Sequence, residues 1–292
     1  MRLVNLDNEV YFKKVFTDPE VFRSFVRDVT GVDMPDAKIE TEKQLERRVS
    51  PIRFKLDIYA ESADKRVLIE IQRIEYDYNF DRFLHYFLAS LVDLQRNSKD
   101  YKFEQDVYTI VVLTAPYTVK TKTGEPLLDD VLVSNLNPRT LQDQVRVMYP
   151  HRLIFLNPNH LSPETPASIR DWLEFIYQSI KNPKDPKINL SNPGIYKAAG
   201  LADIENMPES VLEDAKIMEM TKITQKIYEE KSKAEGIIEG KAEGIIEGIK
   251  KGKAEGIKEG NLKTARALKE LGVSNEIIRQ STGLTDEEID KL

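Results

Sequence analysis

Phe54-Lys-Leu-Asp57-Ile-Tyr59 and Val67-Leu-Ile-Glu70-Ile-Gln72 are the two stretches that decide the fold. Apolar and polar residues alternate in the first, as in a half-buried strand, and the second is rich in β-branched residues. Ala63-Asp-Lys65 between them is typical of a turn, so the two stretches predict a β-hairpin. Alternation within a strand also places Glu70 and Gln72 on one face of the second strand.

Helical and extended patterns surround this hairpin. Apolar residues over 8–29 have helical spacing, with a break near Pro19. The elements expected after the hairpin are a helix from about Tyr78 to Gln95, a strand covered on both faces over Val107–Thr114, short strands over Val145–Tyr149 and Arg152–Leu156, and a helix over Ala167–Ile180. The core is expected to include four phenylalanines, Phe12, Phe16, Phe83 and Phe87. This order predicts an α/β sheet covered by helices.

The composition changes after residue 181. We expect a first domain over 1–182, a linker and helical segment over 183–232, a glycine repeat over 233–260 and a small helical module over 261–292. The last segment carries both basic and acidic residues, which favours a protein-contact module over a reader of the DNA major groove. Glycines at 272 and 283 are expected to separate its short helices.

The repeat holds seven of the chain's 13 glycines, one at every fourth residue. Each glycine inside a helix costs about 1 kcal/mol relative to alanine, so a lone helix is not expected to persist here. A stripe of glycines with isoleucines beside it would let a second helix approach closely. We predict that residues 233–260 form a helix by packing against another subunit, which makes the protein a homo-oligomer. A flexible, charged tether is the alternative.

Composition excludes several classes of protein. The 292 residues are 40% hydrophobic, which rules out a wholly disordered chain, and the absence of cysteine removes disulfides and thiolate chemistry. Three histidines without an HxxxH pair argue against a histidine-built metal site. No segment has the length of a membrane span or the pattern of a signal peptide, so a cytoplasmic protein without membrane association is expected. A net charge of −6 argues against binding of nucleic acid through bulk positive charge.

Local basic residues remain compatible with contacts to DNA. The residues are Lys38, Lys43, Arg47, Arg48, Arg53 and Lys55 in one cluster, Lys120 and Lys122 in a pair, and Arg73 and Arg82 elsewhere. Ordinary solvated charge is the simpler interpretation of each.

Asp57 and Glu70 lie on neighbouring strands of the expected hairpin. In that arrangement the two carboxylates can share one cation, and the main-chain carbonyl of Ile71 could add a ligand. Hard oxygen ligands suit Mg²⁺ or Mn²⁺, and such a site can polarise a phosphodiester and activate water. Two solvent-facing strand residues are the alternative interpretation.

Several motifs, in this order, resemble one family. They are Glu9-Val-Tyr-Phe-Lys-Lys-Val-Phe16, Leu56-Asp-Ile58, Ile69-Glu-Ile-Gln72, Arg82-x-x-x-Tyr86, the glycine tetrads and the ending from Leu271 to Ile289. The sequence resembles the PD-(D/E)xK nuclease family transposases, also called recombination-promoting (Rpn) nucleases. The resemblance implies a PD-(D/E)xK, restriction-endonuclease-like α/β core over 1–182 with a helical C-terminal extension.

The resemblance also implies roles for individual residues. Asp57 and Glu70 would be the metal-binding carboxylates, and Glu9 would bind the ion through water. Gln72 stands where the wider superfamily usually has lysine. Glutamine can orient water and a phosphate oxygen by hydrogen bonds but carries no charge.

Further candidates lie on the helices. Arg82 and Tyr86 share a helical face and would contact the substrate; a surface ion pair with Asp77 or Asp81 is the alternative for Arg82. Lys13 and Lys14 are expected to be helix-surface charges, and a role as phosphate ligands is the alternative.

These residues together predict a Mg²⁺- or Mn²⁺-dependent DNA endonuclease, acting in recombination or on mobile elements. The alternative is a DNA-binding or assembly protein on a nuclease fold with little or no turnover, which the acidic net charge and the missing lysine favour. A purely structural coiled-coil oligomer would leave the grouping of Asp57, Glu70 and Gln72 unexplained.

Overall fold

A computed structural model describes residues 1–44, 55–73, 80–94, 102–114 and 128–292 of the chain. The contacts within it define two compact units, Met1–Glu219 and Met220–Leu292.

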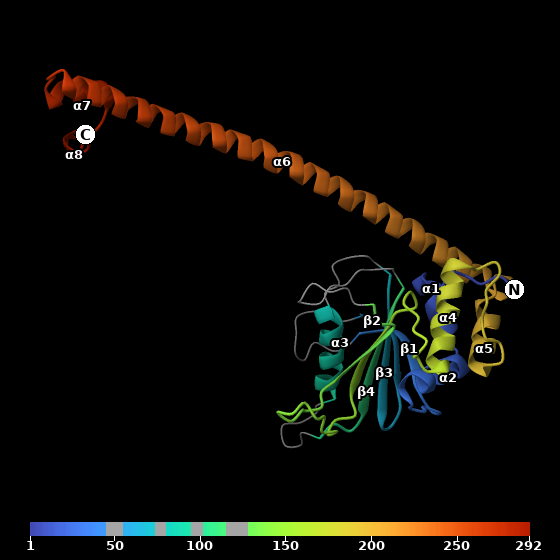
Figure 1. Cartoon of the computed structure of the whole chain (residues 1–292). Coiled ribbons are helices and arrows are strands. Elements are labelled where there is room, and N and C mark those ends of the chain that lie inside the picture. Colours follow the sequence, from blue (N-terminus) through green and yellow to red (C-terminus); the bar gives the residue numbers. More distant parts are fainter. Residues whose placement is uncertain (45–54, 74–79, 95–101, 115–127) are drawn as a thin grey trace. The chain divides into compact units, whose positions relative to one another are not determined.

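The first unit is built on a six-stranded sheet with the order β1-β2-β3-β4-β6-β5 (Figure 1). Its strands are β1 Lys38–Gln44, β2 Lys55–Glu61, β3 Lys65–Gln72, β4 Asp106–Leu113, β5 Val131–Asn135 and β6 Arg152–Leu156. β1, β2 and β3 pair antiparallel, β3, β4 and β6 pair parallel, and β5 is antiparallel to β6. The predicted hairpin is therefore confirmed as β2 and β3.

Helices cover both faces of the sheet. Figure 1 shows α3 Phe80–Asp93 on one face and α1 Glu9–Phe16, α2 Pro19–Thr30, α4 Ala167–Lys181 and α5 Pro193–Ala202 on the other. The expected break near Pro19 is present: the Asp18 side chain caps α2 and Pro19 occupies its first turn. Gly31 ends α2 with a φ of 77°, a left-handed conformation that suits glycine.

β4 lies between two apolar clusters, as its sequence predicts. Ile110 and Val112 pack with α1, α2, α4 and α5, whereas Val111 packs with α3. The four phenylalanines expected in the core, Phe12, Phe16, Phe83 and Phe87, are at most 2% exposed. Burial on both faces places this strand in the core of the unit.

Three strand assignments differ from the sequence-based expectation. Val145–Tyr149 is not a strand: Val145 forms only an isolated bridge with Arg139, and Val147 is 85% exposed. β1 and β5 were not expected because both are edge strands whose polar residues hide the alternation.

Residues 183–207 also differ from the expected linker. α5 buries Ile195, Ala198 and Ala202 in the same core as α4, and a short helical turn, η1 Ile204–Asn206, follows. The apolar residues of α5 are small and lie among prolines and asparagines, so the composition resembles a linker. The first unit consequently extends to Glu219.

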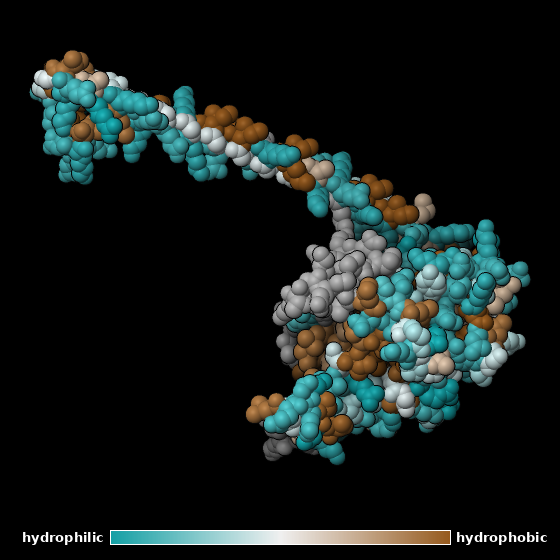
Figure 2. Space-filling view, in the orientation of Figure 1, coloured by the Kyte–Doolittle hydropathy of each residue, from teal (hydrophilic) through white to brown (hydrophobic). Residues whose placement is uncertain are grey.

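α6 runs from Glu209 to Glu270, a single helix of 62 residues. Its first part belongs to the first unit, where Ala215 is buried and its carbonyl accepts a hydrogen bond from Asn8 Nδ2 at 3.1 Å. Figure 2 shows apolar side chains along the solvent-facing part of α6. In the described part of the chain, no helix is both long and apolar enough to cross a membrane.

The second unit ends in a small helical module. The end of α6 packs with α7 Asn275–Thr282 and α8 Asp286–Asp290 around Ala265, Ile278 and Ile289. Gly272 and Gly283 both adopt positive φ, so the expected glycine turns are present. The Thr285 side chain caps α8 in a capping box with Glu288.

Candidate active site

The site lies where β2 and β3 separate. Their main-chain pairing extends from Glu61 and Arg66 to Ile58 and Ile69. At the next position, the Asp57 N–H donates to Glu70 Oε1 at 3.1 Å instead of to a main-chain carbonyl.

A second hydrogen bond links the two strands in the opposite direction. The Ile71 N–H donates to Asp57 Oδ2 at 3.0 Å. Each carboxylate therefore binds the main chain of the opposite strand with one oxygen, which fixes both side chains at the fork between the strands. The strict alternation expected for β2 also breaks here, because Leu56 packs with α3 while Ile58 faces the other core.

Both carboxyl groups have raised pKa values. Burial raises the pKa of Asp57 to about 6; the negative charge of Glu9 adds to this, while the Ile71 N–H and Lys13 oppose it. Glu70 is only 2% exposed, and its burial together with the charge of Asp57 raises its pKa well above the ordinary value. When both are ionised, the buried carboxylates of Asp57 and Glu70 repel each other, and a bound cation would relieve that repulsion.

α1 brings two further charged residues to Asp57. Lys13 Nζ lies 2.5 Å from Glu9 Oε1 and 3.5 Å from Asp57 Oδ1. The Lys13 side chain is 13% exposed, so the expectation of a helix-surface charge is wrong for this residue. Lys14, the next residue along α1, is exposed, as expected. The sequence shows the helical face of Lys13 but not that β2 lies against it.

Glu42 is a residue of this region that the sequence analysis did not single out. In the register of β1 and β2 it lies opposite Asp57, but its φ of 57° interrupts the regular pairing. Its Oε1 lies 3.1 Å from Lys55 Nζ and 3.5 Å from Lys13 Nζ. Lys13 thus lies between Glu42 of β1 and Asp57 of β2.

α3 supplies Arg82 and Tyr86 from the other face of the sheet. Arg82 Nε donates to the Tyr86 hydroxyl at 2.9 Å, and Arg82 Nη1 donates to Gln72 Oε1 at 3.3 Å. Tyr86 is 8% exposed, whereas Arg82 is exposed. The structure therefore joins Arg82, Tyr86 and Gln72 at the side of Glu70.

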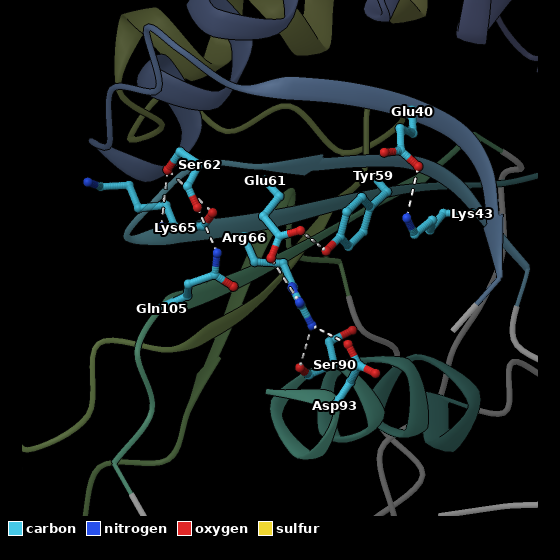
Figure 3. Close-up of polar contacts among 10 residues, drawn as sticks. All are labelled: Glu40, Lys43, Tyr59, Glu61, Ser62, Lys65, Arg66, Ser90, Asp93 and Gln105. Atoms are coloured by element: carbon cyan, nitrogen blue, oxygen red, sulfur yellow. Dashed lines mark hydrogen bonds and ion pairs between the residues drawn. The ribbon is translucent and has the colours of Figure 1, made fainter. Parts of the chain in front are cut away.

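Arg66 holds the far end of α3 against the sheet (Figure 3). Its Nη1 donates to the Ser90 carbonyl at 3.1 Å and to Asp93 Oδ2 at 2.9 Å, and its Nη2 donates to Glu61 Oε1 at 3.0 Å. The guanidinium also lies over the Tyr59 ring, 5.4 Å from its centroid. This buried network fixes the helix that carries Arg82.

Arg73 is structural rather than a free basic residue. Its Nε lies 2.7 Å from Asp7 Oδ2, and its Nη2 donates to Glu219 Oε1 at 2.7 Å. It therefore ties the end of β3, next to Gln72, to the first part of α6. Lys38 and Lys43 both pair with Glu40, and Lys55 pairs with Glu42. The basic candidates Arg47, Arg48, Arg53, Lys120 and Lys122, and the alternative partner Asp77, lie outside the described residues.

Comparison with known protein families assigns the chain to a family. Residues 8–236 match the family model described as PD-(D/E)XK nuclease family transposase. The chain belongs to this family. The match spans α1, the hairpin, α3 and the first part of α6, and the mixed α/β sheet confirms the expected PD-(D/E)XK fold class. No match was found among curated proteins or among solved structures.

Nucleases of the PD-(D/E)XK family usually use divalent metals, and membership points to a nuclease or a transposase-related function. Among the described residues, no group of three or more histidine, aspartate or glutamate side chains is arranged to hold a metal ion. The smaller donor set, Asp57 and Glu70 with the Ile71 carbonyl, still fits a hard cation, because its oxygens are hard ligands and its buried negative charge needs compensation.

Proposed function

We propose that this PD-(D/E)XK family protein is a cytoplasmic, metal-dependent DNA endonuclease that acts in recombination or on mobile elements. The observation that carries the proposal is the buried pair of Asp57 and Glu70 at the fork between β2 and β3. The pair would hold Mg²⁺ or Mn²⁺ with the Ile71 carbonyl, and Glu9 would contact the ion through water. Bound there, the ion would polarise the phosphodiester and make water a better nucleophile.

The surrounding residues would act on the substrate directly. Water attacks phosphorus, and the bond from phosphorus to the leaving sugar oxygen breaks, so negative charge grows on the phosphate oxygens. Arg82, aligned by Tyr86, would stabilise that charge, and the Gln72 amide would orient water or a phosphate oxygen. These roles rest on the position of α3 beside Glu70.

Plasmid nicking with and without Mg²⁺ tests the function. Wild type is expected to nick only with the cation, whereas Asp57→Ala and Glu70→Gln abolish nicking. Glu70→Gln keeps an oxygen that can accept the Asp57 N–H, so it removes charge with little change in structure. Asp64→Ala, in the exposed turn of the same hairpin, is the matched control. A wild-type rate in either site variant would refute the assignment.

A nuclease-fold protein that binds DNA without useful turnover is the second candidate. The uncharged Gln72 and the net charge of −6 favour it. In that case DNA would be retained by wild type but not nicked at any Mg²⁺ or Mn²⁺ concentration.

We also propose that residues 233–260 join two copies of the chain. α6 is helical throughout this segment. Apart from the neighbouring residues and the helix's own backbone, no described atom lies within 4 Å of a Cβ built on any of its seven glycines. Exposed isoleucines lie beside the glycines: Ile237, Ile238, Ile245, Ile246, Ile249 and Ile257. A glycine face of this kind lets two helix backbones approach closely.

The charges of this segment favour an antiparallel second copy. Residues 233–247 hold four glutamates and two lysines, whereas 248–260 hold four lysines and two glutamates. An antiparallel pair would place each acidic half opposite a basic half, and a parallel pair would oppose like charges.

A further inference from the structure

The ammonium of Lys13 lies among carboxylates of the site. Lys13 Nζ contacts Glu9 at 2.5 Å and lies 3.5 Å from both Asp57 Oδ1 and Glu42 Oε1. Burial lowers the pKa of Lys13, but the hydrogen bond to Glu9 and the three negative charges raise it above the ordinary value overall. Contacts from α1, β1 and β2 hold the ammonium in place.

We propose that Lys13 supplies a second positive charge of the active site, besides Arg82, and contacts a non-bridging oxygen of the scissile phosphate. The proposal rests on the proposed function of Asp57 and Glu70. It adds a residue from α1, on the opposite face of the sheet from Arg82, so that the phosphate would be contacted from both sides of the fork.

Gln72 cannot take this role. Its amide is uncharged, and its Oε1 already accepts a hydrogen bond from Arg82. Lys13, in contrast, is 3.5 Å from Asp57, longer than a strong charge-assisted hydrogen bond. An ammonium has three N–H donors, so Lys13 can keep its contact with Glu9 and turn another donor towards a phosphate oxygen.

The same position has a consequence without substrate. The ammonium and a divalent cation would both be attracted to Asp57 Oδ1, and like charges a few ångströms apart repel. Removal of the Lys13 charge should therefore increase the affinity of the site for a cation. A positive charge remote from the cation site would not have this effect.

Full-length variants in the plasmid-nicking assay test the proposal. Lys13→Gln is expected to lower kcat about 100-fold with little change in KM, the typical cost of losing one transition-state contact. Lys13→Arg should recover part of the rate. Lys13→Gln combined with Gln72→Lys should nick faster than Lys13→Gln alone, because it returns a lysine to the site from β3. Lys14→Gln, an exposed neighbour on α1, is the matched control.

Titration of each variant with Mn²⁺ in the absence of DNA supplies a measurement independent of activity. Lys13→Gln is expected to bind Mn²⁺ roughly tenfold more tightly than wild type, and Lys14→Gln equally. The proposal is overturned if Lys13→Gln nicks like wild type, if it binds Mn²⁺ no more tightly, or if neither arginine nor the relocated lysine restores nicking. A wild type that binds Mn²⁺ but never nicks DNA would instead refute the nuclease function, and the Mn²⁺ affinities would still show whether the Lys13 charge acts on the site.

Discussion

The side chains of Asp57 and Glu70 each bind the main chain of the other's strand. The Glu70 carboxylate accepts the Asp57 N–H, and the Asp57 carboxylate accepts the N–H of Ile71, the residue after Glu70. The two carboxylates thus replace main-chain acceptors at the end of a hairpin ladder. They are part of the sheet as well as of the site, so their ionisation should affect both stability and chemistry.

The first prediction concerns the pH dependence of stability. The pKa of Asp57 is about 6 in the folded chain, above its ordinary value of 3.8, so ionisation costs the folded state more than the unfolded state. This cost, up to about 3 kcal/mol, is present above pH 6 and disappears as the pH falls from 6 towards 4. Asp57→Asn should therefore stabilise the metal-free protein at pH 8 but not at pH 4.

Urea unfolding in EDTA at the two pH values provides the measurement. Asp64→Asn, which lies in the exposed turn of the hairpin, serves as the control. An equal effect of Asp57→Asn at pH 8 and pH 4 would contradict the raised pKa.

The second prediction concerns Arg66. Its side chain is 5% exposed and joins Glu61 and Asp93, so Arg66→Met leaves two carboxylates without their buried cation. The free energy of unfolding should fall by about 3 kcal/mol. Loss of the contact with α3 should also weaken nicking, because α3 carries Arg82.

Urea unfolding of Arg66→Met and of Arg23→Met checks this. Arg23 pairs with Asp33 on the surface, and its loss should leave stability nearly unchanged. A similar, small effect of both substitutions would show that the Arg66 network does not hold α3.

The third prediction concerns the C-terminal module. Lys269 Nζ donates to the Ile289 carbonyl at 2.8 Å, and Arg279 lies 3.6 Å from Asp286, so two of its basic residues are engaged within the module. Deletion of 261–292 should leave duplex affinity and its salt dependence unchanged. Fluorescence anisotropy of full-length and truncated protein over a salt series measures both; a shallower salt slope after truncation would identify the module as a DNA-binding element.

The fourth prediction concerns the glycine face of α6. Gly244→Ala should make a single helix more stable by about 1 kcal/mol, whereas Gly244→Leu should also prevent close approach of a second helix. Sedimentation is expected to give an oligomer for the full chain and monomers for 1–230 and for Gly244→Leu. Equal monomeric masses for full-length and 1–230 protein would exclude the oligomer.

The sequence predicts the parts of the site that depend on local pattern. Pairing of the two strands in a hairpin is enough to bring Asp57 next to Glu70, although the strict alternation expected for β2 breaks at this point. Helical spacing is enough to put Arg82 next to Tyr86. Lys13 could not be found in this way, because its environment depends on the packing of α1 against β2. Glu42 could not be found either, since its role depends on a left-handed main-chain conformation that non-glycine residues rarely adopt.

The conformation of Glu42 has a further consequence for assembly. β1 is an edge of the described sheet, and an edge strand with regular hydrogen-bonding groups can recruit strands from other molecules. A left-handed residue in the middle of β1 rotates its peptide groups out of register, so an incoming strand cannot pair along its full length. The irregularity at Glu42, whose carboxylate contacts Lys13, should thereby also oppose edge-to-edge aggregation.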